Sequence, residues 1–295
     1  MMKELREYAR ELLEKGEVAA VIGYRQVSEK RTKPIIITDP ADTEYLVFNE
    51  HCLNNLSVYL TKARIKSLCR TKDRTLKLAI TAKPCDVHSI VALIQENQIH
   101  RDEVHIISFN CHGTVKDFDL EFNGDNLASK CITCETHKPL YFDKIFGEEK
   151  DTPKASDKAL ERIKELESMT HKERFEFFKG EFDRCIKCYA CRAVCPLCYC
   201  QRCITDKSIP RWIESSSHQR GNFSWNIVRA FHLSARCTGC GECDRACPAD
   251  IPLSLINRRM AMEAKNSFSY VSGRSLETPT LVGSFNAKDS DELFM

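Results

Sequence analysis

The sequence predicts an α/β N-terminal domain with a mainly parallel sheet, followed by a second domain organised around cysteines. Three observations lead to this division. Strand-like apolar runs alternate with segments of helical periodicity over residues 1–147. Residues 148–158 are polar and have the composition of a linker. Ten of the 17 cysteines lie between Cys185 and Cys243, and 295 residues are enough for two separate cores.

The N-terminal elements follow from apolar periodicity. Leu5, Leu12 and Leu13 recur at helical spacing within residues 3–15, and Gly16 can end that helix. The remaining elements expected, in chain order, are strands at Val18–Ile22, Pro34–Thr38 and Tyr45–Phe48, a helix at Leu53–Ile65, a strand at Leu76–Thr81, a helix at Asp86–Glu96 and a strand at Val104–Phe109. Strands that alternate with helices favour a parallel sheet.

The C-terminal half begins with a helical linker over residues 148–180. Helices are expected at 159–167 and 172–179, and Thr170 and Glu173 have capping-box spacing. The cysteine-rich domain should run over residues 181–265 and include a helix at 222–234 with Arg229 and His232 at a solvated end. Residues 266–295 fit either an extended arm or a tail.

Charge and composition exclude several classes of protein. The formal net charge is +2, without the basic excess that phosphate neutralisation requires, which argues against nucleic-acid binding. No apolar run reaches the roughly 18 residues of a membrane span, and the first fifteen residues lack the apolar region of a secretory signal. We therefore expect a cytoplasmic protein, whose clustered cysteines bind metal rather than form disulfides.

Two cysteine runs predict a pair of 4Fe–4S clusters. Cys185 to Pro196 and Cys237 to Pro248 both read C-x2-C-x2-C-x3-C-P. In such runs three thiolates bind one cluster and the fourth binds the other. The expected ligand sets are Cys185, Cys188, Cys191 and Cys247 for one cluster, and Cys237, Cys240, Cys243 and Cys195 for the other. Gly239 and Gly241 allow a tight turn that brings amides near sulfur.

Other interpretations of the cysteines remain open. The C-x2-C element also occurs in structural zinc sites, although zinc usually takes two ligand pairs. Three further thiols, Cys198, Cys200 and Cys203, could serve a fourth cluster with Cys52 or Cys69. We favour packing near the clusters for these three, since no fourth ligand is evident nearby.

A third cluster is predicted in the N-terminal domain. Cys85 and Cys111 each follow an expected strand, so both should lie at the carboxyl edge of the sheet. The pair Cys131 and Cys134 could complete four thiolates there. The alternative is two buried cysteines and an unrelated C-x2-C pair. His112 and Lys83 adjoin these thiols and could tune a cluster or lie on a surface loop.

These motifs carry two resemblances. The paired runs resemble the bacterial two-cluster ferredoxin module, which implies a C-terminal α+β ferredoxin-like fold. Lys83-Pro-Cys-Asp86, Asn110-Cys-His-Gly113 and Cys131-Ile-Thr-Cys134 together resemble the beta-subunit family of deazaflavin-reducing hydrogenases and formate dehydrogenases. That resemblance covers about residues 18–147 and implies Cys85, Cys111, Cys131 and Cys134 as ligands.

The expected function is electron relay through three clusters within an oxidoreductase complex of the formate dehydrogenase, hydrogenase or heterodisulfide-reductase type. The resemblance implies redox partner subunits, including a flavoprotein, and hence a hetero-oligomer. Full beta subunits bind FAD, but the sequence lacks Gly-x-Gly-x-x-Gly, which counts against flavin here. The alternatives are a flavin-bearing catalytic subunit and a zinc-binding structural protein. Neither a Ser–His–Asp nor a Cys–His catalytic layout stands out.

Overall fold

The computed structural model describes residues 1–70, 75–132, 134, 136–148, 158–285 and 287. The chain divides into two compact units. The N-terminal unit comprises Met1–Ser156 together with Gly273–Leu276, and the C-terminal unit comprises Asp157–Ser272 together with Glu277–Met295.

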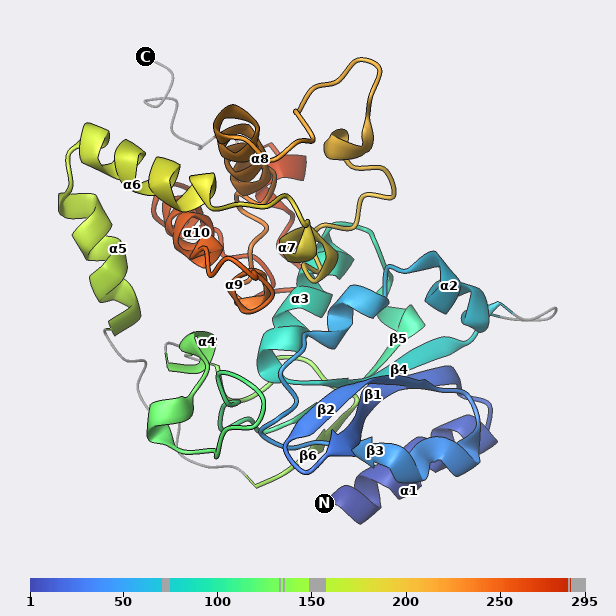
Figure 1. Ribbon diagram of the computed structural model, residues 1–295. Helices are drawn as coiled ribbons and strands as arrows, with labels where there is room; N and C mark the ends of the chain where they lie inside the picture. Colours follow the sequence, from blue (N-terminus) through green and yellow to red (C-terminus); the bar gives the residue numbers. More distant parts are fainter. Residues whose placement is uncertain (71–74, 133, 135, 149–157, 286, 288–295) are drawn as a thin grey trace. The chain divides into compact units, whose positions relative to one another are not determined.

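Six strands within the described residues form one mixed, mainly parallel sheet in the N-terminal unit (Figure 1). They are β1 (Val18–Ser28), β2 (Arg31–Ile37), β3 (Leu46–Val47), β4 (Lys77–Ala82), β5 (Val104–Phe109) and β6 (Lys144–Phe146). The order is β2-β1-β4-β5-β6, with β3 also paired to β1. The pairs β1–β4, β4–β5 and β5–β6 are parallel, whereas β2 and β3 pair antiparallel with β1. The predicted α/β architecture is confirmed.

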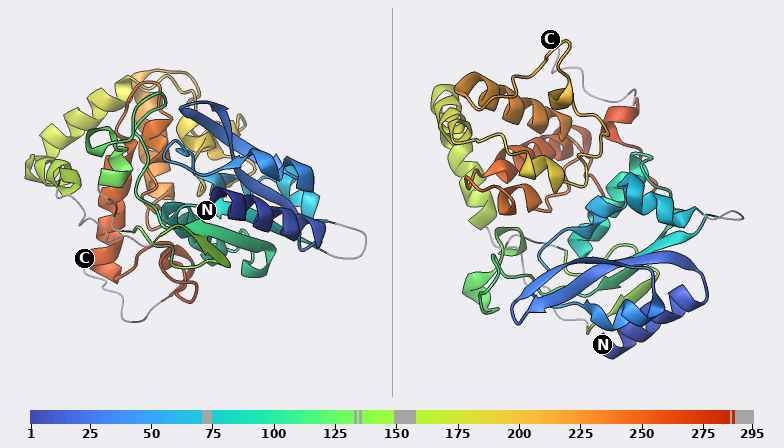
Figure 2. Two further views of the ribbon diagram at one scale, coloured as in Figure 1. Left: turned by 90° about the horizontal axis from the view of Figure 1, so that it is seen from below. Right: turned by 45° about the vertical axis from the view of Figure 1, so that its right-hand side comes forward.

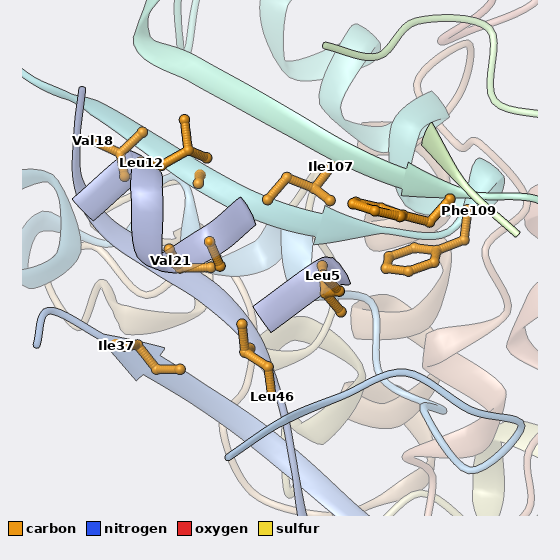
Figure 3. Packing of buried hydrophobic residues seen from close by; sticks show 11 residues of the cluster. Leu5, Leu12, Val18, Val21, Ile37, Leu46, Ile107 and Phe109 are labelled. Carbon is orange, nitrogen blue, oxygen red and sulfur yellow. The ribbon is translucent and has the colours of Figure 1, made fainter. Parts of the chain in front are cut away.

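Helix α1 (Met2–Glu14) packs an apolar stripe against one face of this sheet. Leu5, Ala9 and Leu12 recur at helical spacing and are buried against Val21 and Ile107 (Figure 3). Helix α3 (Pro84–Gln95) follows β4 on the opposite face (Figure 1). Coverage on both faces explains why β4 and β5 are almost continuously buried rather than alternating.

The predicted helix at Leu53–Ile65 is wrong. This segment instead contains a 3-10 turn at Leu56–Tyr59, the short helix α2 (Ala63–Lys66) and a second 3-10 turn at Ser67–Cys69. The Asn55 side chain accepts a hydrogen bond from the Ser57 amide at 3.0 Å, which starts a new turn and competes with a continuous helix. The apolar side chains of this segment are buried although they belong to separate short turns, so their spacing resembles that of one continuous helix.

The C-terminal unit is helical (Figure 2). Its helices are α5 (Lys158–Ser168), α6 (His171–Asp183), α7 (Ala190–Ala193), α8 (Gln219–His232), α9 (Glu242–Arg245) and α10 (Leu253–Phe268). Between residues 158 and 285 the structure contains no strand, so the α+β expectation for this unit is wrong. That expectation came from the cysteine motif and not from any period-2 pattern.

Local signals explain the helices that precede each cysteine run. The Thr170 hydroxyl accepts from the Glu173 amide at 3.3 Å, and the Glu173 carboxylate accepts from the Thr170 amide at 2.7 Å. This capping box confirms the expected start of α6, which ends two residues before Cys185. Helix α8 packs against α6 and α10, and it leads the chain toward Cys237.

No helix in the described part of the chain has both the length and the apolar character needed to cross a bilayer.

Candidate iron–sulfur centres

The structure gathers a first set of four thiols around one small cavity. Cys185, Cys188, Cys191 and Cys247 all line it, together with Trp225. Lys187 and Tyr189 have positive φ angles of 56° and 57°, which fold the loop between α6 and α7 tightly. Burial raises the pKa of Cys191, and the negative charges of the other three thiols raise it further. Four sulfur atoms from two distant runs therefore face the same space.

A second set combines the last cysteine of the first run with three from the second run. Burial raises the pKa of Cys240 to about 12, and the charges of Cys195 and Cys237 add to that rise. Burial also raises the pKa of Cys237, as does the charge of Cys195. Burial raises the pKa of Cys243 as well, and the charges of Cys237 and Cys240 contribute to that rise. The fourth cysteine of each run thus lies with the opposite set.

Glycine geometry shapes the loop of this second set. Gly239 and Gly241 have φ angles of +73° and +67°, in the left-handed region that glycine adopts without strain. The Gly239 amide donates to the Cys237 sulfur, and the Glu242 amide donates to the Cys240 sulfur. Such N–H to sulfur hydrogen bonds are a means by which proteins adjust cluster potentials.

A third set lies at the carboxyl edge of the N-terminal sheet. Cys85 is in the first turn of α3 directly after β4, and Cys111 follows β5. Cys131 belongs to the short helix α4 (Ser129–Ile132), and Cys134 follows it. Burial, together with the charges of Cys131 and Cys134, raises the pKa of Cys111 to about 11. Burial, Asp86 and Cys111 together raise the pKa of Cys85.

Backbone amides also point at the sulfur atoms of the third set. Cys111 Sγ accepts from the Gly113 amide at 3.4 Å, Cys131 Sγ from the Thr114 amide at 3.3 Å and Cys134 Sγ from the Thr136 amide at 3.4 Å.

The donor chemistry of all three sets fits 4Fe–4S clusters. Each set has four thiols, most of them at least partly buried. Burial raises the pKa of seven of these thiols: Cys85, Cys111, Cys134, Cys191, Cys237, Cys240 and Cys243. These seven resist ionisation when free, and binding of iron would have to displace their protons. Among the described residues, no group of three or more His, Cys, Asp or Glu side chains is arranged to hold a single metal ion. Ligands of a cube each bind a different iron, so they are spread around a larger body than one ion.

Lys83 is buried next to the third set, and its ammonium group makes several polar contacts. Its ammonium donates to Tyr24 Oη at 2.5 Å and to the Asn54 carbonyl at 2.7 Å, and it lies 2.9 Å from the Asp86 carboxylate. Burial lowers the pKa of Lys83, but the charges of Asp86, Cys85 and Cys52 and the hydrogen bond to Asp86 together outweigh burial, and the net shift is upward. His112, in contrast, is exposed.

A cavity of about 610 Å³ borders the third set. Cys111, His112 and Lys83 line it together with the aromatic pair Phe48 and Phe109. The two rings stack with centroids 3.5 Å apart and planes 7° apart. Its size lies within the range of small-molecule and cofactor sites.

The remaining thiols do not form a comparable set. Cys198 donates a hydrogen bond to Cys195, which lowers the pKa of Cys195 and raises that of Cys198. Cys203 bonds with Thr205 and Arg192, whereas Cys200 is exposed. Cys52 and Cys69 are buried within the N-terminal unit.

Two predictions about the end of α8 have opposite outcomes. His232 is exposed, as expected, but Arg229 is only 4% exposed, so its expected place at a solvated helix end is wrong. Arg229 donates to the Cys191 carbonyl at 3.1 Å. The signal that could have identified it is helical spacing, because Asn222, Asn226 and Arg229 fall on one face that also includes the buried Trp225.

Comparisons with known proteins agree with these motifs. A family model described as a 4Fe-4S dicluster domain matches residues 181–251. The chain is 28% identical to the F420-dependent formate dehydrogenase subunit beta of Methanocaldococcus jannaschii, over 70% of this chain and 76% of that protein. It is 24% identical to the F420-dependent formate dehydrogenase 1 subunit beta of Methanococcus maripaludis, over 92% of this chain and 90% of that protein. The expected resemblance to beta subunits of formate dehydrogenases is confirmed.

Proposed function

We propose that this chain is the iron–sulfur subunit of a hetero-oligomeric oxidoreductase of the formate dehydrogenase type, and that it relays single electrons through three 4Fe–4S clusters. The observation that carries the proposal is the convergence of twelve cysteines into three sets of four. The proposed ligands are Cys185, Cys188, Cys191 and Cys247; Cys195, Cys237, Cys240 and Cys243; and Cys85, Cys111, Cys131 and Cys134. A cytoplasmic location accompanies the proposal, because free thiols at this density need a reducing compartment.

The clusters, when bound, would supply the one-electron chemistry. The protein residues do the rest of the work. Thiolates hold iron, apolar neighbours such as Trp225 and Ile251 exclude water, and amides at Gly239 and Gly113 direct N–H groups at sulfur. Cys191 lies in α7 and Cys195 follows two residues after the end of that helix, so the short segment between them keeps the first two sets close together.

Analysis of iron, acid-labile sulfide and zinc in anaerobically purified protein tests the proposal. We expect about twelve irons and twelve sulfides per chain, and three EPR-active clusters after reduction. About eight irons would mean that the third cluster is absent. About sixteen would mean that a fourth cluster is bound, with Cys198, Cys200 and Cys203 among its ligands. Stoichiometric zinc without sulfide would overturn the proposal in favour of a structural zinc protein.

Single substitutions assign the clusters to their ligands. Cys111→Ser should remove about four irons and leave the signals of the other two clusters unchanged. Cys247→Ser should affect the cluster held by Cys185, Cys188 and Cys191, although it is closer in sequence to the second run. Cys200→Ser is the matched control, because this thiol is exposed and belongs to none of the three sets.

One observation supports a second candidate, a flavin-bearing subunit. The 610 Å³ cavity next to Cys111 is lined by the stacked rings of Phe48 and Phe109, and a planar ring system could occupy such a site. Stoichiometric flavin absorbance in the purified protein would favour this candidate. Its loss on Phe109→Ala, with iron content retained, would locate the flavin in this cavity.

A further inference from the structure

Helix α8 directs a buried polar face at the first cysteine run. Asn222, Asn226 and Arg229 are spaced four and three residues apart and are 1%, 3% and 4% exposed. Asn222 Nδ2 donates to the Cys185 carbonyl at 2.7 Å, and Asn226 Nδ2 donates to the Asn222 carbonyl at 2.8 Å. Arg229 Nη2 donates to the Cys191 carbonyl at 3.1 Å. This face therefore holds the backbone of two candidate ligands from one helix.

Arg229 also lies near sulfur atoms of both C-terminal sets. The Cys191 that it contacts belongs to the first set, and Cys195 of the second set lies four residues further along the same segment. Burial raises the pKa of Cys191 and of Cys243, and the charge of Arg229 opposes that rise at both thiols.

One donor of Arg229 has no acceptor in the described protein. Its Nε is buried and makes no hydrogen bond there. A buried N–H without an acceptor is costly, about 1–3 kcal/mol for an ordinary group and more for a charged one. Such a donor next to thiols of two sets indicates that its acceptor is the sulfur of a bound cluster.

We propose that Arg229 is a positioning residue shared by both C-terminal clusters, whose fixed positive charge and Nε–H raise the reduction potentials of both. The inference rests on the proposed function. A 4Fe–4S cluster gains one negative charge when one electron enters, and no proton needs to accompany that electron. Arg229 keeps its proton throughout, because a guanidinium does not titrate in proteins. A buried cation close to both clusters is weakly screened, so it stabilises the reduced form of each.

EPR-monitored redox titration of the cluster-loaded full chain tests this proposal. Arg229→Gln keeps hydrogen-bonding capacity but removes the charge. We expect it to shift the reduction equilibrium of both C-terminal clusters at least tenfold toward the oxidised form, which corresponds to about 59 mV for one electron. Arg229→Lys retains the charge, so its potentials should shift by less than half as much as those of Arg229→Gln.

Two controls separate local charge from general effects. Arg220→Gln removes one positive charge from the exposed side of the same helix and should leave both potentials unchanged. The cluster of the N-terminal unit serves as an internal reference, and its potential should be the same in every variant.

The outcomes are distinct. Full iron content in Arg229→Gln with unchanged potentials, or a shift confined to one cluster, would overturn the inference while the proposed function stands. If Arg229→Gln loses iron but Arg229→Lys does not, the potentials of Arg229→Lys decide: values close to those of the unsubstituted protein would support the inference, and a full tenfold shift would overturn it. Loss in both variants would assign Arg229 a structural role alone and overturn it. Absence of iron and sulfide from the unsubstituted protein would overturn the proposed function itself.

Discussion

Replacing Lys83 with Met should destabilise the N-terminal unit strongly. Lys83 is 1% exposed and Asp86 is fully buried, with the ammonium 2.9 Å from the carboxylate. Removing one partner of a buried ion pair leaves an uncompensated charge and typically costs about 3–5 kcal/mol. Lys83→Met also takes the donor away from Tyr24 Oη and from the Asn54 carbonyl. At about 1.4 kcal/mol per factor of ten, opening of this unit should become two to four orders of magnitude more frequent.

Hydrogen–deuterium exchange with mass spectrometry of peptides from β4 and α3 measures that opening directly. Tryptophan fluorescence would not report it, because Trp212 and Trp225 both belong to the C-terminal unit. The double variant Lys83→Met/Asp86→Asn removes both charges and should recover most of the loss, since no buried charge is then left unpaired. A change of less than tenfold in Lys83→Met, or a double variant no better than the single one, would refute this reasoning.

Three further predictions concern the centres and their surroundings. Gly113 has a φ of +107°, and an added Cβ would lie 2.8 Å from Leu127 Cδ2. Gly113→Ala should therefore cost about 1–3 kcal/mol of stability and release about four irons. Gly180→Ala is the control, because an added Cβ there meets nothing within 4 Å, and iron analysis should show no change. Burial and Arg274 lower the pKa of His88 from 6.5 to about 4, so its contribution to stability is complete above pH 6.5 and is lost as the pH falls toward 4. Urea unfolding by circular dichroism should show a loss of about 3 kcal/mol over that range, which His88→Leu abolishes. Cys198→Ala should leave the iron content unchanged, because Cys198 bonds to Cys195 and belongs to no set of four, whereas Cys195→Ala should release about four irons.

Much of the N-terminal unit could be predicted because its signals are local. β5 has the bounds expected from its apolar run, Val104–Phe109, and α3 begins two residues before its expected start. The failure at Leu53–Ile65 has a local cause too: the Asn55 side chain bonds to the backbone and starts a turn, and apolar spacing alone does not reveal that competition.

In the C-terminal unit the grouping of the cysteines could be predicted from the sequence, but the surrounding structure could not. Fixed spacing in C-x2-C-x2-C-x3-C predicts which thiols approach one another, because a tight loop limits their separation. The role of α8 could not be found in the same way. Helical spacing places Asn222, Asn226 and Arg229 on the same face as Trp225, but the sequence does not show that this face packs against the loop of Cys185 and Cys191. The missing strands of the C-terminal unit have the same origin, since a ligand motif specifies a loop and not the elements beside it.

Residues 273–276 bear on the order in which the protein matures. Gly273 bonds to Gln95, Arg274 donates to Thr136 at 3.0 Å and Leu276 bonds to Tyr141, so this late segment completes the N-terminal unit around the Cys134 loop. On the ribosome the four thiols of the third set emerge first, but residues 273–276 are synthesised only after both C-terminal cysteine runs. The contacts of Arg274 and Leu276 with Thr136 and Tyr141 therefore cannot form until most of the chain has been synthesised.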